Sequence, residues 1–362
     1  MRRALMGVGV AAFGRGLAEV EAVVEWHRTL VFPRLTALLQ AMSGTAVSTL
    51  GEVIALVLIF LLMSWLMARR TRAIGDVALV LGLVVFAFYG TWGLAYRYPP
   101  LSGRLAPLPG TPEGGDTSAG LIGLVEESAL LTARAAFGPL ALGGDDREFL
   151  ARVNAGLRAG SARVPQSIEA SPVETVAFGP VKPSRVSFAL SRLQLSGYYF
   201  PWTGEAQINA EMPRSLWPRV AAHEKAHQRG FARENEATVI GVLTCLLSSD
   251  PTVFYSGSLG LFVSLDRELA RADPEARRRI WGTLPRRVTE DLRQEAAFWK
   301  AHEGVAGEVS QKVNDSYLKA QGVRSGVASY AETTRLLLQA RQTDSLGLSR
   351  LLKSPPSLPW GK

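Results

Sequence analysis

The sequence predicts a mainly helical protein with a small β-sheet, in which an N-terminal transmembrane helical hairpin precedes an α+β domain that binds a metal ion. Two long apolar runs near the N-terminus predict the hairpin. Helical spacing of apolar residues over most of the later chain predicts the helices, and a short aromatic stretch around Phe200 predicts the sheet. The histidine pair of an HExxH motif predicts the metal ion.

The transmembrane hairpin is expected at residues 46–96, with spans at about 50–68 and 77–96. Each run is close to the roughly twenty apolar residues that a helix needs to cross a bilayer. Tyr89, Trp92 and Tyr96 lie where an interfacial aromatic belt is expected. Three arginines in the short loop between the runs place that loop in the cytoplasm, and everything after Tyr96 outside it.

Four segments complete the expected domain organisation. Residues 1–45 have a basic start and an interrupted apolar run, which fits either a marginal third span or a short amphipathic element. Residues 97–120 are rich in proline and glycine and are expected to form a linker. Residues 121–345 are expected to hold the metal-binding domain, and residues 346–362 a C-terminal tail.

The central motif is HEKAH at residues 223–227. Residues four apart lie on one face of a helix, so His223 and His227 can bind one ion through imidazole nitrogens. Glu224 then stands beside the metal, where a carboxylate can act as general base towards a metal-activated water. The chain has only four histidines, so chance is a poor explanation for the motif. We therefore expect Zn2+ as the cofactor.

A catalytic zinc needs a third protein ligand. Gly230 is placed to end the motif helix in a left-handed conformation, and a second helix is expected to begin near residues 231–233. The first turn of that helix carries Glu234 and Glu236, and either carboxylate can reach the metal. Arg233 stands where HExxHxxGxxH has its third histidine, and a guanidinium cannot ligate zinc.

The stretch ENEAT resembles the ExxA(D/N) signature of membrane zinc proteases that process prenylated proteins. The resemblance makes Glu234 the third ligand, with Glu236 in reserve, and Ala237 the small residue at the helix crossing. The acidic or amide position of the signature falls on Thr238, whose hydroxyl can still hydrogen-bond a ligand histidine. Two histidines and a glutamate from the next helix are the ligand set of a gluzincin, so the expected domain is zincin-like and of gluzincin type.

Composition and one further segment indicate the partners. Residues 204–209, GEAQIN, are expected as an edge strand beside the metal that receives an extended peptide or protein substrate. The formal net charge is +8, but the basic residues are scattered and no nucleic-acid fold signature occurs. We therefore expect no nucleic acid, and we expect membrane lipid as a partner through the hairpin. Cys245, the only cysteine, is expected as a buried apolar residue.

From roughly Val24 to Leu338 the chain resembles an uncharacterised family of bacterial membrane-anchored zincin-like proteins, known only as a domain of unknown function. The matching motifs are GYYFPWTGEAQIN, HEKAHQRGFARENEA, SDPTVFYSG and VNDSYLKAQGVRSGVASYAETTRLLL. The resemblance implies a metallopeptidase-like fold and supplies no substrate. Its motifs offer tyrosines that can stabilise an oxyanion: Tyr317 first, and Tyr255 and Tyr330 as alternatives.

These observations lead to a membrane-anchored zinc metallopeptidase that hydrolyses peptide bonds with metal-activated water and Glu224 as general base. The expected location is a bacterial inner membrane, with the catalytic domain on the extracytoplasmic side. The alternative is a non-catalytic cell-envelope protein with a structural or degenerate metal site. His302 is expected to be a surface or packing residue rather than a further ligand.

Overall fold

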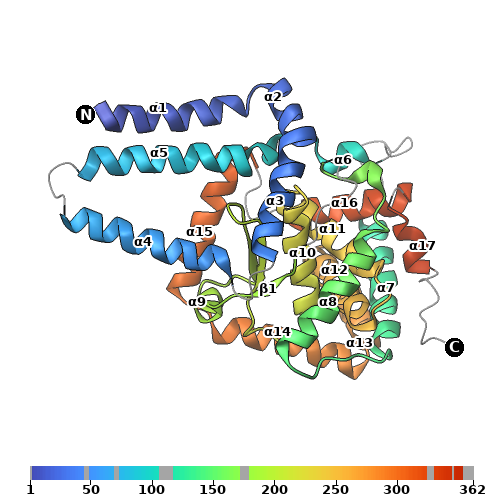
Figure 1. Ribbon diagram of the computed structural model, residues 1–362. Coiled ribbons are helices and arrows are strands. Elements are labelled where there is room, and N and C mark those ends of the chain that lie inside the picture. Colours follow the sequence, from blue (N-terminus) through green and yellow to red (C-terminus); the bar gives the residue numbers. More distant parts are fainter. Residues whose placement is uncertain are drawn as a thin grey trace.

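The computed structural model describes residues 2–44, 49–68, 73–105, 117–171, 179–323, 330–344 and 346–353. A large helical body carries a small sheet, and helices α1, α4 and α5 extend from one side of that body (Figure 1). The N-terminal helices are α1 (Arg2–Leu17), α2 (Glu21–Trp26), the π-helix η1 (His27–Val31), α3 (Phe32–Gly44), α4 (Leu50–Ala68), α5 (Ala73–Thr91), the 3-10 helix η2 (Gly93–Arg97) and α6 (Leu101–Arg104). The expected mainly helical class with a small sheet is confirmed.

Helices α1 and α5 pack side by side at very close range (Figure 1). A Cβ atom added to Gly7 would lie 2.0 Å from the carbonyl oxygen of Ala78, and one added to Gly82 would lie 2.1 Å from that of Gly7. Only glycine fits at this crossing, because any side chain would push the two backbones apart. Arg3 also forms an ion pair with Asp76, which joins the N-terminal ends of the two helices.

Among the described residues, no helix is long and apolar enough to cross a membrane. The predicted transmembrane hairpin is therefore wrong, and so is the inner-membrane localisation that followed from it. The second expected span illustrates the reason, because α5 ends at Thr91 and the chain continues as η2. Tyr89, Trp92 and Tyr96, expected in an aromatic belt, are buried in the protein core. The loop arginines used to orient the hairpin lie outside the described residues.

Residues 97–105, the first part of the segment expected as a linker, contribute to the core, and residues 106–116 lie outside the described residues. Tyr98, Leu101 and Leu105 are buried, with exposed fractions of 4% or less. Apolar side chains in a proline-rich stretch can be buried where the backbone polar groups find partners. Leu101 is an example, because its backbone N–H donates to the carboxylate of Glu236, 2.9 Å away.

Helices form the rest of the body around α11 and α12, whose apolar side chains are almost all buried. Several begin with an aspartate whose side chain accepts backbone N–H bonds, as Asp145, Asp250 and Asp273 do. The remaining helices are α7 (Thr117–Ala136), α8 (Asp146–Ser161), the 3-10 helix η3 (Gln166–Ile168), α9 (Ser187–Arg192), α10 (Trp217–Gln228), α11 (Glu234–Leu246), α12 (Pro251–Ala272), α13 (Pro274–Thr283), α14 (Arg286–Ala301), α15 (Val305–Ala320), α16 (Tyr330–Thr343) and α17 (Leu348–Lys353).

The sheet has three short strands in the order β1-β3-β2, with β1 (Lys182–Pro183), β2 (Gly197–Phe200) and β3 (Glu205–Ile208). β3 pairs in parallel with β1 and antiparallel with β2. The expected edge strand GEAQIN is therefore the central strand, and all four residues of β3 are buried. β2 pairs along all of β3, and β1 pairs with Gln207 and Ile208 on the other side, so β3 is not the free edge that strand addition needs.

Candidate metal centre

Two helices and the turn between them bring three metal-ligating side chains together. α10 carries His223 and His227 on one face, and Glu234 is the first residue of α11. The carboxylate Oε2 of Glu234 lies 3.1 Å from Nε2 of His223 and 3.7 Å from Nε2 of His227. The three ligand atoms lie within 4.8 Å of one another. Tetrahedral zinc with bonds of about 2.0–2.1 Å separates its ligand atoms by roughly 3.3 Å, so this donor set fits zinc.

Hydrogen bonds fix the tautomer of both imidazoles. Nδ1 of His227 donates to the carbonyl oxygen of Phe231 at 2.7 Å, which leaves Nε2 as the nitrogen that binds a metal once its proton is displaced. Nδ1 of His223 lies 3.3 Å from Oγ1 of Thr238, and that hydroxyl itself donates to the backbone oxygen of Glu234 at 2.8 Å. The threonine oxygen is thus free to accept from His223. Both Nε2 atoms therefore face the shared carboxylate, as zinc ligation requires.

The cluster is electrostatically coupled. Burial alone would lower the pKa of His227, but the neighbouring Glu234 carboxylate raises it to about 9. Burial alone would raise the pKa of Glu234, but His227 and His223 hold it well below its ordinary value. The negative charge of Glu234 is therefore maintained at neutral pH, which suits a metal ligand.

Glu224 lies next to the two histidines on α10 and is buried, with 4% of the residue exposed. Burial raises the pKa of its carboxyl to about 7, against the opposing effect of His223 and His227. The start of β2 covers it closely, because a Cβ atom added to Gly197 would lie 2.9 Å from Oε1 of Glu224. Glycine at the first position of β2 thus makes room for this carboxylate.

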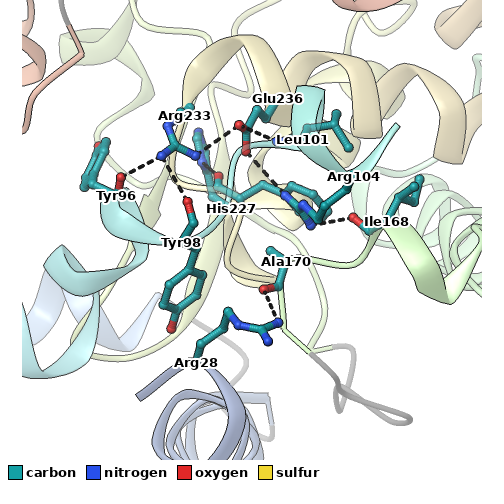
Figure 2. A network of polar contacts seen from close by, with 11 residues as sticks. Arg28, Tyr96, Tyr98, Leu101, Arg104, Ile168, Ala170, His227, Arg233 and Glu236 are labelled. Atoms are coloured by element: carbon teal, nitrogen blue, oxygen red, sulfur yellow. Dashed lines mark hydrogen bonds and ion pairs between the residues drawn. The ribbon is translucent and has the colours of Figure 1, made fainter. Parts of the chain in front are cut away.

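Glu236, the reserve ligand, lies elsewhere. Figure 2 shows its carboxylate between Arg233 and Arg104, at 3.1 Å and 3.7 Å, in addition to the bond from Leu101. Arg233 also donates to the backbone oxygens of Tyr96 and Tyr98, at 2.9 Å and 3.1 Å. Arg233, which stands where HExxHxxGxxH has its third histidine, therefore attaches the buried segment after α5 to the start of α11. Sequence analysis had assigned it no role.

The three candidate tyrosines have different surroundings. Tyr317 on α15 is half-buried and packs edge-on against Tyr96, with the ring centroids 6.0 Å apart. Burial raises the pKa of Tyr317 to about 12, and the charge of Glu234 also raises it, so this hydroxyl is a protonated donor near the cluster. Tyr255 is fully buried and donates to Asp291 at 2.6 Å, away from the cluster. The side chain of Tyr330 lies outside the described residues.

One family model, described as Protein of unknown function (DUF3810), matches residues 27–338. The chain belongs to that family. No curated protein and no solved structure gives a match. The site of this family member is therefore interpreted from its own geometry.

Two residues of this DUF3810 protein lie where sequence analysis expected them. His302 packs on Phe298 and its Nδ1 donates to the backbone oxygen of that residue at 2.8 Å, so it is a packing residue at the end of α14. Cys245 is fully buried. Sequence analysis missed Tyr96, which it expected at a membrane interface: this tyrosine is buried, and its ring packs edge-on against Tyr317 and Trp92. Tyr96 is far from the HExxH motif in the sequence, so no local pattern could indicate that the two lie close together.

A cavity of about 850 Å³ adjoins the cluster, and His223, Glu234 and Thr238 form part of its wall. The cavity gives a ligand access to His223 and Glu234, and the buried Glu224 follows His223 directly in α10. A metal site with three protein ligands, one open side and a neighbouring carboxylate can perform metal-assisted hydrolysis.

Proposed function

We propose that this protein is a zinc-dependent metallopeptidase of gluzincin type, in which His223, His227 and Glu234 bind zinc. The observation that carries the proposal is the meeting of two Nε2 atoms and one carboxylate oxygen within 4.8 Å, beside an open cavity. Zinc bound there would polarise the peptide carbonyl and activate water. The zincin-like resemblance of the HExxH motif agrees with this assignment.

The chain's own residues have separate roles in the proposed reaction. Glu224 takes the proton from the attacking water and passes it to the leaving amine. Tyr317, protonated at neutral pH, donates a hydrogen bond to the oxyanion that develops at the carbonyl. Thr238 and the backbone oxygen of Phe231 hold the two imidazoles in the ligating tautomer.

The decisive experiment compares zinc content and hydrolysis in matched variants. We expect the purified protein to bind about one zinc ion per chain, and His223→Ala and His227→Ala to abolish that binding. Glu224→Gln should keep zinc and lose at least about a thousandfold in the hydrolysis of a fluorogenic peptide mixture. His302→Ala is the control, because it removes a histidine outside the cluster and should leave both properties intact.

The outcomes separate the alternatives. Stoichiometric zinc in both histidine variants would refute the site, and full turnover by Glu224→Gln would refute the mechanism. Zinc binding without hydrolysis by the unaltered protein would favour the non-catalytic alternative, a structural metal site.

A further inference from the structure

The cavity beside the candidate metal centre has a basic wall. Besides the ligands His223 and Glu234, its charged lining residues are Arg219, Arg267 and Arg271 and the single carboxylate Glu295. Arginines therefore outnumber carboxylates on this wall, and one of them, Arg271, also forms an ion pair with Glu268 beside it. A cavity of this charge attracts and retains anionic groups.

Arg219 is the arginine closest to the cluster along α10. It precedes His223 by one helical turn, which places the two side chains on one face about 6 Å apart along the axis. Its Nη2 forms an ion pair with Glu295 on α14, and each of the two side chains is 13% exposed. Its Nη1 is buried and has no hydrogen-bond partner among the described residues.

The guanidinium of Arg219 is held in place before any ligand arrives. A Cβ atom added to Gly260 on α12 would lie 3.1 Å from Cδ of Arg219, so the glycine lets the arginine stem lie directly on α12. Glu295 fixes the other end of the side chain. An arginine fixed in this way binds a further carboxylate at little cost in side-chain entropy.

We propose that Arg219 binds a carboxylate of the peptide substrate next to the scissile bond. This inference rests on the proposed peptidase function and names its substrate class. The carboxylate is either the free C-terminus of the peptide or the side chain of an aspartate or glutamate. The guanidinium of Arg219 donates to it, Glu295 positions that guanidinium, and Arg267 contributes positive potential along the rest of the wall.

Three peptides of one sequence test the proposal: one neutral with an amidated C-terminus, one with a free C-terminus, and one amidated with a single Gln replaced by Glu. Their kcat/KM values are measured with the zinc-loaded protein. Their affinities are measured by calorimetry with zinc-loaded Glu224→Gln protein and with zinc-free protein, which gives a readout that does not depend on turnover. The variants are Arg219→Gln, the double variant Arg219→Gln/Glu295→Gln, and the control Arg286→Gln, whose side chain is 90% exposed.

We expect one of the two acidic peptides to be preferred over the neutral peptide by about ten- to a hundredfold, both in kcat/KM and in affinity. In Arg219→Gln that ratio should fall towards one, mainly through KM, with zinc content retained. In the double variant Glu295 no longer carries a buried charge without a partner, so the fold is not destabilised by that charge. The acidic preference should still be lost, which would show that the loss in Arg219→Gln comes from substrate recognition and not from misfolding. Arg286→Gln should keep the ratio of the unaltered protein. Which acidic peptide is preferred distinguishes the C-terminal carboxylate from the side chain.

Different results would contradict the role of Arg219 and the peptidase function. Hydrolysis without an acidic preference, or a preference that survives in both Arg219 variants, would overturn the role of Arg219. If acidic peptides bound more tightly in a way that depends on Arg219 but were not hydrolysed, the carboxylate-binding role of Arg219 would stand and the proposed peptidase function would be wrong.

Discussion

Two glutamates separated by one residue at the start of α11 have opposite environments. Glu234 lies against both histidines of the motif, whereas Glu236 is buried between Arg233 and Arg104. Residues two apart on a helix point about 200° from each other, so only one of the pair can face the two histidines. This part of the site is predictable from sequence, because helical geometry over a few residues decides it and the ExxA spacing selects the first glutamate.

Separate measurements of zinc affinity and stability should distinguish the two glutamates. We expect Glu234→Ala to lose zinc to a micromolar chelator, because it removes a direct ligand. Glu236→Ala should retain zinc but lower the free energy of unfolding by about 3–5 kcal/mol, because it leaves two arginines without their buried partner. Zinc titration and denaturant unfolding give the two readouts. If Glu236→Ala lost zinc and Glu234→Ala retained it, Glu236 rather than Glu234 would be the third ligand.

At the scale of elements, the turn that ends α10 orients one of the candidate metal ligands, His227. The N–H of Gly230 donates to the backbone oxygen of His227 at 2.8 Å, and that of Phe231 donates to Ala226 at 3.2 Å. Together with the positive φ of 94° at Gly230, these bonds form a Schellman motif. The motif turns the chain so that the carbonyl oxygen of Phe231 meets Nδ1 of His227. The glycine that ends the helix therefore also orients a ligand.

Replacing Gly230 with alanine should affect both stability and zinc affinity. The left-handed conformation disfavours a side chain, and the new Cβ would lie 3.0 Å from Cε1 of Phe32. We expect the free energy of unfolding to fall by about 1–2 kcal/mol and zinc affinity to fall by about tenfold as the Phe231 carbonyl shifts.

Gly282→Ala in α13 is the control for Gly230→Ala. No heavy atom lies within 4 Å of its added Cβ, and it is not in the left-handed region. Its unfolding free energy should therefore change by less than about 1 kcal/mol, and its zinc affinity should not change. Equal effects of the two substitutions would refute the role of the Gly230 turn.

Sequence reasoning succeeded and failed on elements for physical reasons. The HExxH helix and its glycine end depend on residues close together in the chain, and these were predicted. The position of β3 depends on β1, a strand of only two residues that carries no pattern of its own. Hydropathy at residues 77–96 reports apolar side chains but not what covers them, and here Tyr89, Trp92 and Tyr96 are covered by the protein.

At the scale of the whole molecule, one buried carboxylate joins α4 to the sheet. Glu205 in β3 accepts from the backbone N–H groups of Leu50 and Gly51 at 2.9 Å and 2.6 Å, and so caps the start of α4. Lys182 in β1 completes the contact, with its Nζ 2.6 Å from Oε1 of Glu205. The fit is close, since a Cβ atom on Gly51 would lie 2.5 Å from Cδ1 of Phe200. No sequence pattern links residues so far apart in the chain, and this docking was not predicted.

Glu205→Gln should loosen α4 selectively. The amide cannot accept both backbone N–H bonds, and it removes the negative charge that faces the Lys182 ammonium, whose side chain is 6% exposed. We expect a loss of about 3–5 kcal/mol in the free energy of unfolding. Amide hydrogen exchange at the start of α4 should accelerate more than exchange in α11, because the helix loses its anchor before the body unfolds.

Asp266→Asn supplies the matched comparison, since it converts a carboxylate that joins α12 to α13 through Arg277 and Trp281. It should lower global stability without a selective effect on α4, because its partners lie in a different part of the body. If exchange in α4 rose equally in the two variants, the acceleration would report general destabilisation, and Glu205 would not be the anchor of that helix. Selective acceleration in Glu205→Gln alone would show that the sheet beneath the candidate metal centre also holds the helix that extends from the body.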